Sequence, residues 1–210
     1  MEIHPPTHPI SGWKETVKHL AIITAGVLIA LALEGIVTWG DHRVLVREAV
    51  ANLTSELQNN QKELSGLFAS LQKERQQFDH LHEITGLVLA GKPLTNESIT
   101  LDSHGAEVKN AAVTTGQITG AFGYMEYSEV RRYADVYDLQ AQFMRLQERE
   151  GQHFSDVLAL IRRIVSADHP NAETVERWRA SIDVAIAGVT AREQLARQLQ
   201  RRYEEILAEH

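Results

Sequence analysis

The stretch from residue 20 to residue 39 constrains this chain more than any other part of its sequence. It reads LAIITAGVLIALALEGIVTW, twenty residues in which Glu34 is the only charged side chain. A helix of about 20 residues spans about 30 Å, the thickness of the hydrocarbon core of a bilayer. Trp13 and Trp39 bracket the run, and amphipathic aromatic side chains favour the two membrane interfaces. The pattern predicts a transmembrane helix with these two tryptophans as interface anchors.

Two other interpretations of this run are possible. A buried core helix rarely carries apolar side chains on every side over such a length. A cleavable signal peptide is the stronger rival, because residues 30–32 (ALA) resemble a cleavage site. Apolar residues continue to Trp39, however, and a heptad repeat begins directly afterwards, so cleavage would leave an apolar stub on a long helix. An uncleaved signal anchor fits the sequence better.

The chain therefore divides into three parts. Residues 1–18 form a short N-terminal tail, residues 19–40 the anchor, and residues 41–210 a helical extramembrane domain. Basic residues flank the anchor on both sides, so the positive-inside rule gives nearly a tie between the two orientations: Lys14, Lys18, Arg43 and Arg47. The short tail favours a cytoplasmic N-terminus and a periplasmic domain at the bacterial inner membrane.

A heptad repeat follows the anchor and predicts a long helix that continues from it without a break. Its seam consists of residues at alternating steps of three and four: Val50, Leu53, Leu57, Asn60, Leu64, Leu67 and Leu71. Asn60 either fixes register or partner number at a buried position, or faces a wet part of an intramolecular bundle. Glu74 occupies a further seam position. A second copy of the chain could also pair through this seam, giving a homo-oligomer.

Two more long helices are predicted. The first helix should end near residues 90–93, where Gly91 is followed by Pro93. The segment over residues 106–119 is open between a helix and a loop. A helix beginning near Ser128 carries an apolar stripe that residues 148–151 interrupt: Val130, Ala134, Tyr137, Ala141, Met144, Phe154, Val157, Ile161 and Ile164.

The last helix follows a turn at residues 168–171, where Pro170 ends one helix and Asp or Asn can cap the next. Its stripe has helical spacing: Val175, Trp178, Ile182, Ala185, Val189, Leu195, Leu199, Tyr203 and Ile206. No segment alternates convincingly as a strand. The predicted fold is all-α, with the anchor helix running into an antiparallel three- or four-helix bundle.

The composition of the chain excludes several classes of partner and site. Twenty-eight Asp and Glu against 21 Lys and Arg argue against a nucleic-acid partner, and the absence of cysteine excludes disulfides and thiolate metal sites. The sequence contains no zinc-protease, nucleophile-elbow, phosphate-loop or dinucleotide motif. His80 and His82 do not share a helix face, and paired carboxylates such as Glu148 and Glu150 suit solvated faces. We expect no catalytic residue, metal or cofactor.

The anchor itself carries candidate docking residues. Gly26 and Ala30 form a small-xxx-small pair, which lets membrane helices pack closely, although ordinary alanine usage explains the pair equally well. An ionised side chain costs about 2.5–3.5 kcal/mol at the centre of a span, and less nearer the interface. Glu34 therefore hydrogen-bonds a neighbouring membrane helix, is protonated near the interface, or belongs to an ion path. We favour the first interpretation.

A second candidate surface combines tyrosine and arginine: Tyr124, Tyr127, Arg131, Arg132 and Tyr133. These residue types are enriched at interface hot spots. The end of a helical bundle uses the same residues to cover its core, with tyrosine hydroxyls at the rim. The sequence leaves both interpretations open.

Four short segments resemble a group of bacterial single-pass membrane proteins of uncharacterised function. The group has an N-terminal G-x-x-x-A-L anchor, a basic stretch and an acidic E-L-x-x-N helix. The matching segments are residues 26–31 (GVLIAL), 53–60 (LTSELQNN), 114–120 (TTGQITG) and 129–137 (EVRRYADVY). The resemblance implies an anchor followed by a helical domain and transfers no catalytic residue.

These observations predict a non-catalytic accessory or structural subunit that docks into a larger membrane protein complex. Its expected partners are the lipid bilayer and other membrane protein subunits. The alternative is a periplasmic helical sensory module, which would act through a partner because the N-terminal tail is too short for an output domain. An enzyme with an unrecognised site is the least favoured class.

Overall fold

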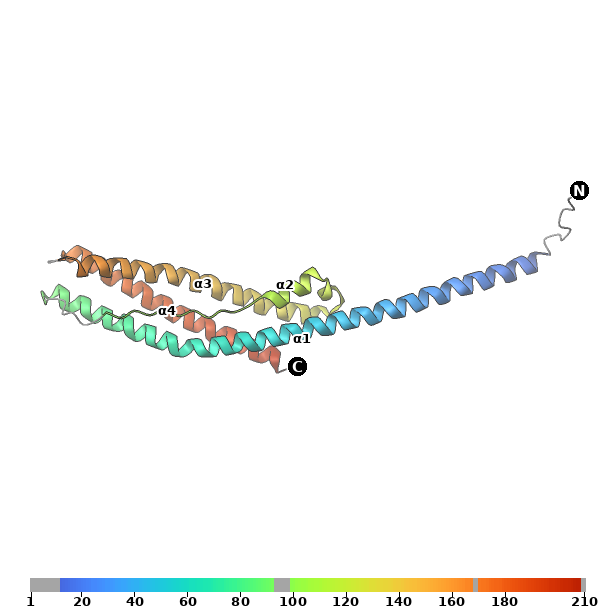
Figure 1. Cartoon of the computed structure of the whole chain (residues 1–210), viewed down its shortest axis with the longest axis horizontal. Helices are drawn as coiled ribbons and strands as arrows, with labels where there is room; N and C mark the ends of the chain where they lie inside the picture. Colours follow the sequence, from blue (N-terminus) through green and yellow to red (C-terminus); the bar gives the residue numbers. More distant parts are fainter. Residues whose placement is uncertain (1–11, 93–98, 168–169, 209–210) are drawn as a thin grey trace, which may run out of the picture. The chain divides into compact units, whose positions relative to one another are not determined.

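The computed structural model describes residues 12–92, 99–167 and 170–208. Within these residues, four α-helices and one 3₁₀-helix follow one another (Figure 1): α1 (Trp13–Leu89), α2 (Ala111–Ile118), η1 (Ala121–Tyr124), α3 (Tyr127–Val165) and α4 (Ala172–Leu207). No strand occurs in these described ranges, so the prediction of an all-α chain is confirmed. Pro93, Asp168 and His169, which the sequence places at helix ends, lie outside the described residues.

The chain separates into two compact units, residues 1–48 and residues 49–210. Within the first unit, α1 already begins at Trp13, so the end of the expected tail is helical. An 18-residue window of this helix has a mean hydropathy of 2.4, and none of it is buried in the structure. By length and composition this segment could cross a membrane.

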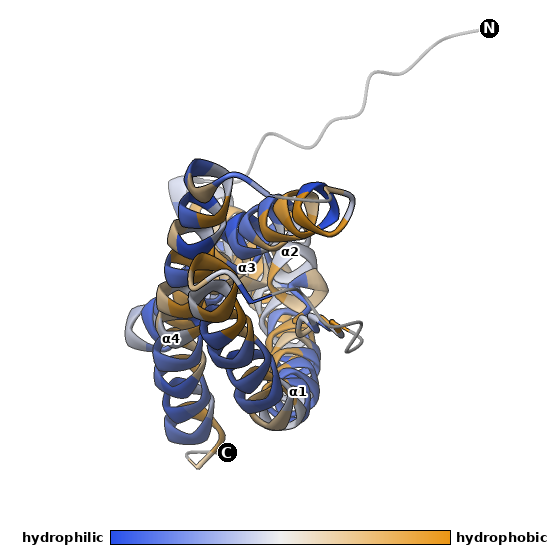
Figure 2. Cartoon of the chain, turned by 90° about the vertical axis from the view of Figure 1, so that its left-hand side faces the viewer, coloured by the Kyte–Doolittle hydropathy of each residue, from blue (hydrophilic) through white to orange (hydrophobic). Residues whose placement is uncertain are grey.

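The second unit, called the helical domain below, has one hydrophobic core. It is built from α1 beyond residue 49 together with α3 and α4, which lie side by side (Figure 1). Its largest fully buried apolar and aromatic side chains come from all three helices: Trp178, Tyr133, Tyr203, Phe78, Phe143, Leu53, Leu57, Leu64, Leu71, Leu81 and Ile164. Hydrophilic residues dominate the visible outer side of α4 (Figure 2), as expected of a helix that buries one face.

The helix ends follow local sequence signals. Gly91 adopts a positive φ of 78° after α1, Lys92 N–H donates to the Leu87 carbonyl at 3.1 Å, and Gly91 N–H donates to the Val88 carbonyl at 3.0 Å. This pair of hydrogen bonds is a Schellman ending, and glycine adopts its left-handed conformation without steric cost. At the start of α4, Asn171 accepts a hydrogen bond from Thr174 N–H at 2.7 Å, as predicted for a cap.

Helix α3 differs from the prediction in two ways. It begins at Tyr127 and runs unbroken through residues 148–151. Its first half also buries a different face from the expected stripe. The buried residues are Tyr133, Val136, Tyr137, Gln140 and Phe143, whereas Val130 and Ala141 are only half-buried and Ala134 and Met144 are exposed. An apolar stripe could not reveal this face, because polar side chains that find hydrogen-bond partners occupy part of it.

An extended segment lies between α1 and α2. Residues 99–110, called the strap here, have no regular secondary structure and run along the helical domain (Figure 1). They lead into α2, so the segment that the sequence leaves open is extended up to Asn110 and helical from Ala111. Extended backbone beside a core requires hydrogen-bond partners from elsewhere. In this domain, buried and half-buried side chains of α1 and α3 supply them.

Candidate functional site

The three candidate docking residues of the apolar segment follow one side of α1. Gly26, Ala30 and Glu34 are spaced by four residues, which places them on the same helix face, and all three are exposed. A Cβ added at Gly26 would meet no atom within 4 Å. Thr38 Oγ1 donates a hydrogen bond of 2.9 Å to the Glu34 backbone carbonyl, a local contact that leaves the face open. This face is therefore available to lipid or to another helix.

The two predicted interface anchors are also exposed. Trp13 lies at the first turn of α1, and Trp39 lies at the far end of the apolar run. The Arg43 guanidinium stacks over the Trp39 ring at 4.7 Å from its centroid, a cation–π contact. The end of the apolar segment thus combines an amphipathic ring with a basic group.

The tyrosine and arginine cluster is smaller than the sequence suggests. Tyr124, Tyr127, Arg131 and Arg132 are exposed, but Tyr133 is only 2% exposed and lies in the core. The reason is the helical register of α3, which places residue 133 on the same face as the buried residues 136 and 140. Tyr133 is therefore withdrawn from the candidate partner surface.

The seam of α1 lies inside the helical domain. Leu53, Leu57, Leu64, Leu67 and Leu71 are buried in the core shared with α3 and α4. At the start of the seam, Val50 is only half-buried and its neighbour Ala49 is buried instead. Since these side chains are covered within one chain, a second copy could not use the same seam without opening the core.

Asn60 is the centre of a buried hydrogen-bond network, so it does not face a wet part of the domain. Its Nδ2 donates to the Lys109 carbonyl at 2.8 Å, and its Oδ1 accepts from Lys109 N–H at 2.8 Å. Gln140 Nε2 donates to the same carbonyl at 2.8 Å, while Gln140 Oε1 accepts from Asn60 at 3.1 Å and from the Tyr203 hydroxyl at 2.6 Å. The network joins the strap to all three long helices and satisfies the buried amides.

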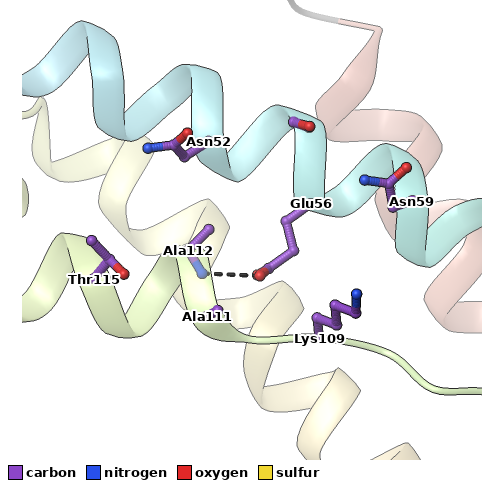
Figure 3. A pocket seen from close by; sticks show the side chains of 8 residues that line it. Asn52, Glu56, Asn59, Lys109, Ala111, Ala112 and Thr115 are labelled. Atoms are coloured by element: carbon purple, nitrogen blue, oxygen red, sulfur yellow. Dashed lines mark hydrogen bonds between the residues drawn. The ribbon is translucent and has the colours of Figure 1, made fainter.

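Glu56 of α1 contacts both α2 and α3, and Figure 3 shows its contact with α2. One carboxylate oxygen accepts the Tyr137 hydroxyl at 2.7 Å, and the other accepts Ala112 N–H at 2.9 Å in the first turn of α2. Asn110, the N-cap residue of α2, makes no side-chain cap bond, so Glu56 serves as a cap supplied by α1. Burial, together with the hydrogen bond to Glu56, raises the pKa of Tyr137, which keeps this hydroxyl protonated as a donor.

Two further side chains hold the strap. Gln147 accepts from Ala106 N–H at 2.9 Å and donates to the Ala106 carbonyl at 3.2 Å. A Cβ on Gly105 would lie only 2.6 Å from the Gln147 amide, so a larger residue there would displace this side chain from its present position. Gln77 Oε1 accepts from Asp102 N–H at 3.1 Å. These contacts bind the main chain of the strap and so hold its position along α1 and α3.

A group of charged side chains lies deeper in the core. Glu74, on the α1 seam, binds the Arg192 guanidinium and accepts the Ser103 hydroxyl at 3.1 Å. Glu74 and Arg192 are 3% and 1% exposed. Burial raises the pKa of Glu74, and the neighbouring Arg192 charge opposes that rise. Arg192 Nε is buried without a hydrogen-bond partner in the described part of the chain, so the pair is incompletely satisfied.

Glu150 lies close to this pair. Burial raises the pKa of its carboxyl, while the charges of His153 and Arg192 oppose the rise. A Cβ on Gly188 would overlap the Glu150 carboxylate, so the glycine provides the space in which this group lies. Glu150 is therefore part of the core, which corrects the expectation of a solvated carboxylate pair with Glu148.

A small open pocket of about 310 Å³ lies between α1 and α2 (Figure 3). Amide and hydroxyl side chains supply much of its lining: Asn52, Ser55, Asn59 and Thr115. Its carboxylate, Glu56, already binds Ala112 and Tyr137. The volume is at the lower limit for small-molecule sites, about 300–1,000 Å³. Among the described residues, no group of three or more His, Asp or Glu side chains could hold a metal ion.

Sequence reasoning missed three buried polar groups, Gln140, Glu150 and Arg192, and the half-buried Gln147. A signal for them exists in the spacing. From Tyr133 to Ile164, steps of three and four connect the inward positions of α3 without a break, and polar residues occupy some of them: 133, 136, 140, 143, 147, 150, 154, 157, 161 and 164. Following the heptad register through polar residues would have found this face.

Comparisons of the chain with protein-family models, curated proteins and solved structures gave no match. Its function is therefore argued from its own residues.

Proposed function

We propose that this protein is a non-catalytic, membrane-anchored accessory subunit of a larger bacterial membrane protein complex. The observation that carries the proposal is the apolar segment of α1. Its most apolar window has a mean hydropathy of 2.4 and is wholly exposed, so it needs an apolar environment outside the described structure. The bilayer provides that environment, and the resemblance of short segments to a group of bacterial single-pass membrane proteins is consistent with it.

The domain outside the membrane is a bundle in which α4 runs antiparallel to α3 and to the second part of α1, whereas α3 runs parallel to α1, with the strap along it. Three observations support a structural role for this domain, in which its elements are held in fixed positions. The amides of Asn60 and Gln147 each hold both main-chain groups of one strap residue. Glu56 caps α2 from another helix, and the buried Glu74 and Arg192 pair with each other. These polar groups thus fix elements relative to one another. In this proposal the bundle lies in the periplasm and the N-terminus in the cytoplasm.

Docking into the complex uses the face of Gly26, Ala30 and Glu34. Small residues permit close approach of a second membrane helix, because lipid offers no hydrophobic drive for helix association. An ionised group in the middle of a span costs about 2.5–3.5 kcal/mol, and a hydrogen bond from a neighbouring helix reduces that cost. Glu34 therefore acts as the polar contact of this docking face, and surfaces of the bundle add to it.

Co-purification tests the subunit proposal. Mild detergent extraction followed by size-exclusion chromatography should recover the chain together with larger membrane proteins. Recovery only as an isolated monomer or homodimer would contradict the proposal.

Two variants test the docking face. Glu34→Leu should still insert into the membrane but dissociate from the complex more readily, whereas Glu34→Gln keeps a hydrogen-bonding group and should retain more of the association. If Glu34→Leu associates as well as the wild type does, Glu34 is not a docking residue. Protease added to spheroplasts tests the orientation, because a periplasmic bundle is digested and a cytoplasmic one is protected.

A further inference from the structure

The connection between α2 and α3 carries unusually exposed apolar and aromatic side chains. Ile118 is 81% exposed, Tyr127 is 80% exposed and Tyr124 is 52% exposed. Ile118 and Tyr127 are the most exposed large hydrophobic residues among the described part of residues 49–210. We call residues 118–127 the aromatic turn. An exposed apolar patch of this kind marks a surface that meets another apolar or amphipathic phase.

Packing contacts fix the conformation of the aromatic turn. Phe122 packs against Gly116, where a Cβ would lie 2.7 Å from the Phe122 ring. Gly120 adopts a φ of 74°, a left-handed conformation that glycine reaches readily, and Ala121 is fully buried. The turn is fixed from inside while Ile118, Tyr124 and Tyr127 project outward. Their exposure is therefore a property of the fold.

The course of the strap and α2 shows at which end of the helical domain the turn lies. Going forward, Asp102 contacts Gln77, Lys109 contacts Asn60 and Ala112 contacts Glu56, so this segment runs antiparallel to α1. Next, Thr115 shares the pocket lining with Asn52 (Figure 3). Each step moves toward lower numbers on α1. Residue 118 and the aromatic turn therefore lie at the end of the domain that begins at Ala49.

The contacts of helix α3 independently place the aromatic turn at the end of the domain that begins at Ala49. Tyr137 binds Glu56, and Tyr127 lies ten residues earlier in the same helix, about 15 Å farther toward that end. The opposite end of α3 is Val165, which is 59% exposed and about 57 Å from Tyr127 along the helix. The two ends of α3 thus provide a matched pair of exposed apolar positions.

Ala49 follows Trp39 by only ten positions in the chain. A chain of ten residues reaches about 35 Å at most, so the Ala49 end of the domain stays near any membrane surface at Trp39. A patch held at this distance by a tether has a high effective concentration at that surface and needs little intrinsic affinity.

We propose that the aromatic turn seats on the headgroup zone of the bilayer, with Ile118 and Tyr127 inserted among the lipids. Tyrosine prefers this zone because its ring is apolar and its hydroxyl is polar. Arg131 and Arg132 can meet lipid phosphates, but Glu126 and Glu129 balance their charge, so the apolar and aromatic side chains carry the contact. The inference rests on the membrane anchoring in the proposed function.

Lipid quenching tests this contact in the full chain. The chain has no cysteine, so Ile118→Cys and Val165→Cys each accept one fluorophore at an exposed position. Each labelled protein is reconstituted into vesicles of phosphatidylethanolamine and phosphatidylglycerol that contain a lipid with a headgroup nitroxide. We expect several-fold stronger quenching and a blue-shifted emission at position 118. If Ile118→Cys disturbs folding by circular dichroism, Tyr127→Cys replaces it and should behave the same way.

Each outcome has a separate meaning. Equal quenching at 118 and 165 in proteins that float with the vesicles overturns the inference and leaves anchoring intact. Failure of the chain to float with the vesicles overturns the anchoring itself. Shielding of the label at 118 in native membranes, without quenching in pure lipid vesicles, also overturns the inference, because a protein partner then covers the turn.

Discussion

Helix α1 passes through two regions in which apolar side chains of the same kinds differ in their exposure. In residues 20–39 the leucines, isoleucines and valines are exposed, whereas in residues 53–71 the seam leucines are almost wholly buried. The first region is apolar on every side and contains one carboxylate. The second is apolar on one face and contains one buried amide, Asn60, with the buried carboxylate of Glu74 just beyond it. A helix that is apolar all round requires an external apolar phase, while a one-sided helix requires partners from its own chain.

The largest expected effect comes from breaking the buried ion pair of the helical domain. Arg192→Met leaves Glu74 buried without its guanidinium partner and should lower the free energy of unfolding by about 3–5 kcal/mol. Denaturant titration of the full chain in detergent measures this loss. The double variant Glu74→Leu with Arg192→Met removes both charges and should recover most of it, because apolar replacement of a buried pair is often neutral or stabilising.

An exposed ion pair supplies the control for that experiment. Arg202 and Glu205 are 2.8 Å apart at the surface of α4, and Arg202→Met should change the free energy of unfolding by about 0–1 kcal/mol. If the Arg192 single variant and the double variant lose equal stability, the charges do not act as a pair.

The second prediction compares two leucines of α1 directly. Leu57→Ala leaves a cavity in the core and should lower the free energy of unfolding of the domain by about 2–5 kcal/mol. Leu28→Ala removes an exposed side chain from the apolar segment, so unfolding of the domain should be unchanged. Both are measured in the same detergent. A comparable loss for Leu28→Ala would show that the apolar segment packs against the domain and that the two regions do not differ as described.

A third prediction concerns pH and the buried carboxylate of Glu150. Burial raises its pKa, so the folded chain binds more protons than the unfolded chain between the unfolded value, about 4.3, and the raised folded value. The stability that this group contributes is present at low pH and is lost as the pH rises through the folded pKa. Glu150→Gln cannot titrate, so its free energy of unfolding should decline less over this range, as denaturant titrations at a series of pH values would show.

The matched control for this prediction is Glu148→Gln, which changes an exposed carboxylate on the same helix. It should leave the pH dependence as in the wild type. Identical pH profiles for Glu150→Gln and the wild type would contradict the assignment of Glu150 to the core.

Local signals explain what the sequence could predict. The helical class, the continuation of α1 through Gly40, the ending at Gly91 and the Asn171 cap all depend on residues close together in the chain. The core stripe of α4 is also nearly complete from its spacing, with Arg192 and Ala196 as additions and Leu195 only half-buried. Such features follow from backbone preference and helical periodicity alone.

A stripe of apolar residues alone could not predict the polar groups in the interior. Gln140 is buried because the Lys109 carbonyl, Asn60 and Tyr203 satisfy its amide, and these partners lie 31 to 80 residues away in the chain. The predicted stripe of α3 contained apolar residues only. It therefore followed a helix face next to the one that is buried, and Tyr133 was assigned to the surface. Long-range hydrogen bonds decide which polar residues belong to the core.

The smallest expected effect tests whether a local signal, the Asn171 cap, stabilises the chain independently of the core. Asn171→Ala removes the side-chain acceptor of Thr174 N–H and should lower the free energy of unfolding by about 1 kcal/mol, measured by denaturant titration. Asn171→Asp keeps an acceptor at the helix N-terminus and should stay close to the wild type. Equal losses for both variants would mean that a side-chain acceptor at this position does not account for the stabilisation. Because the cap lies outside the core, its loss should add to that of Leu57→Ala without coupling, whereas variants within the Asn60 network should not be additive.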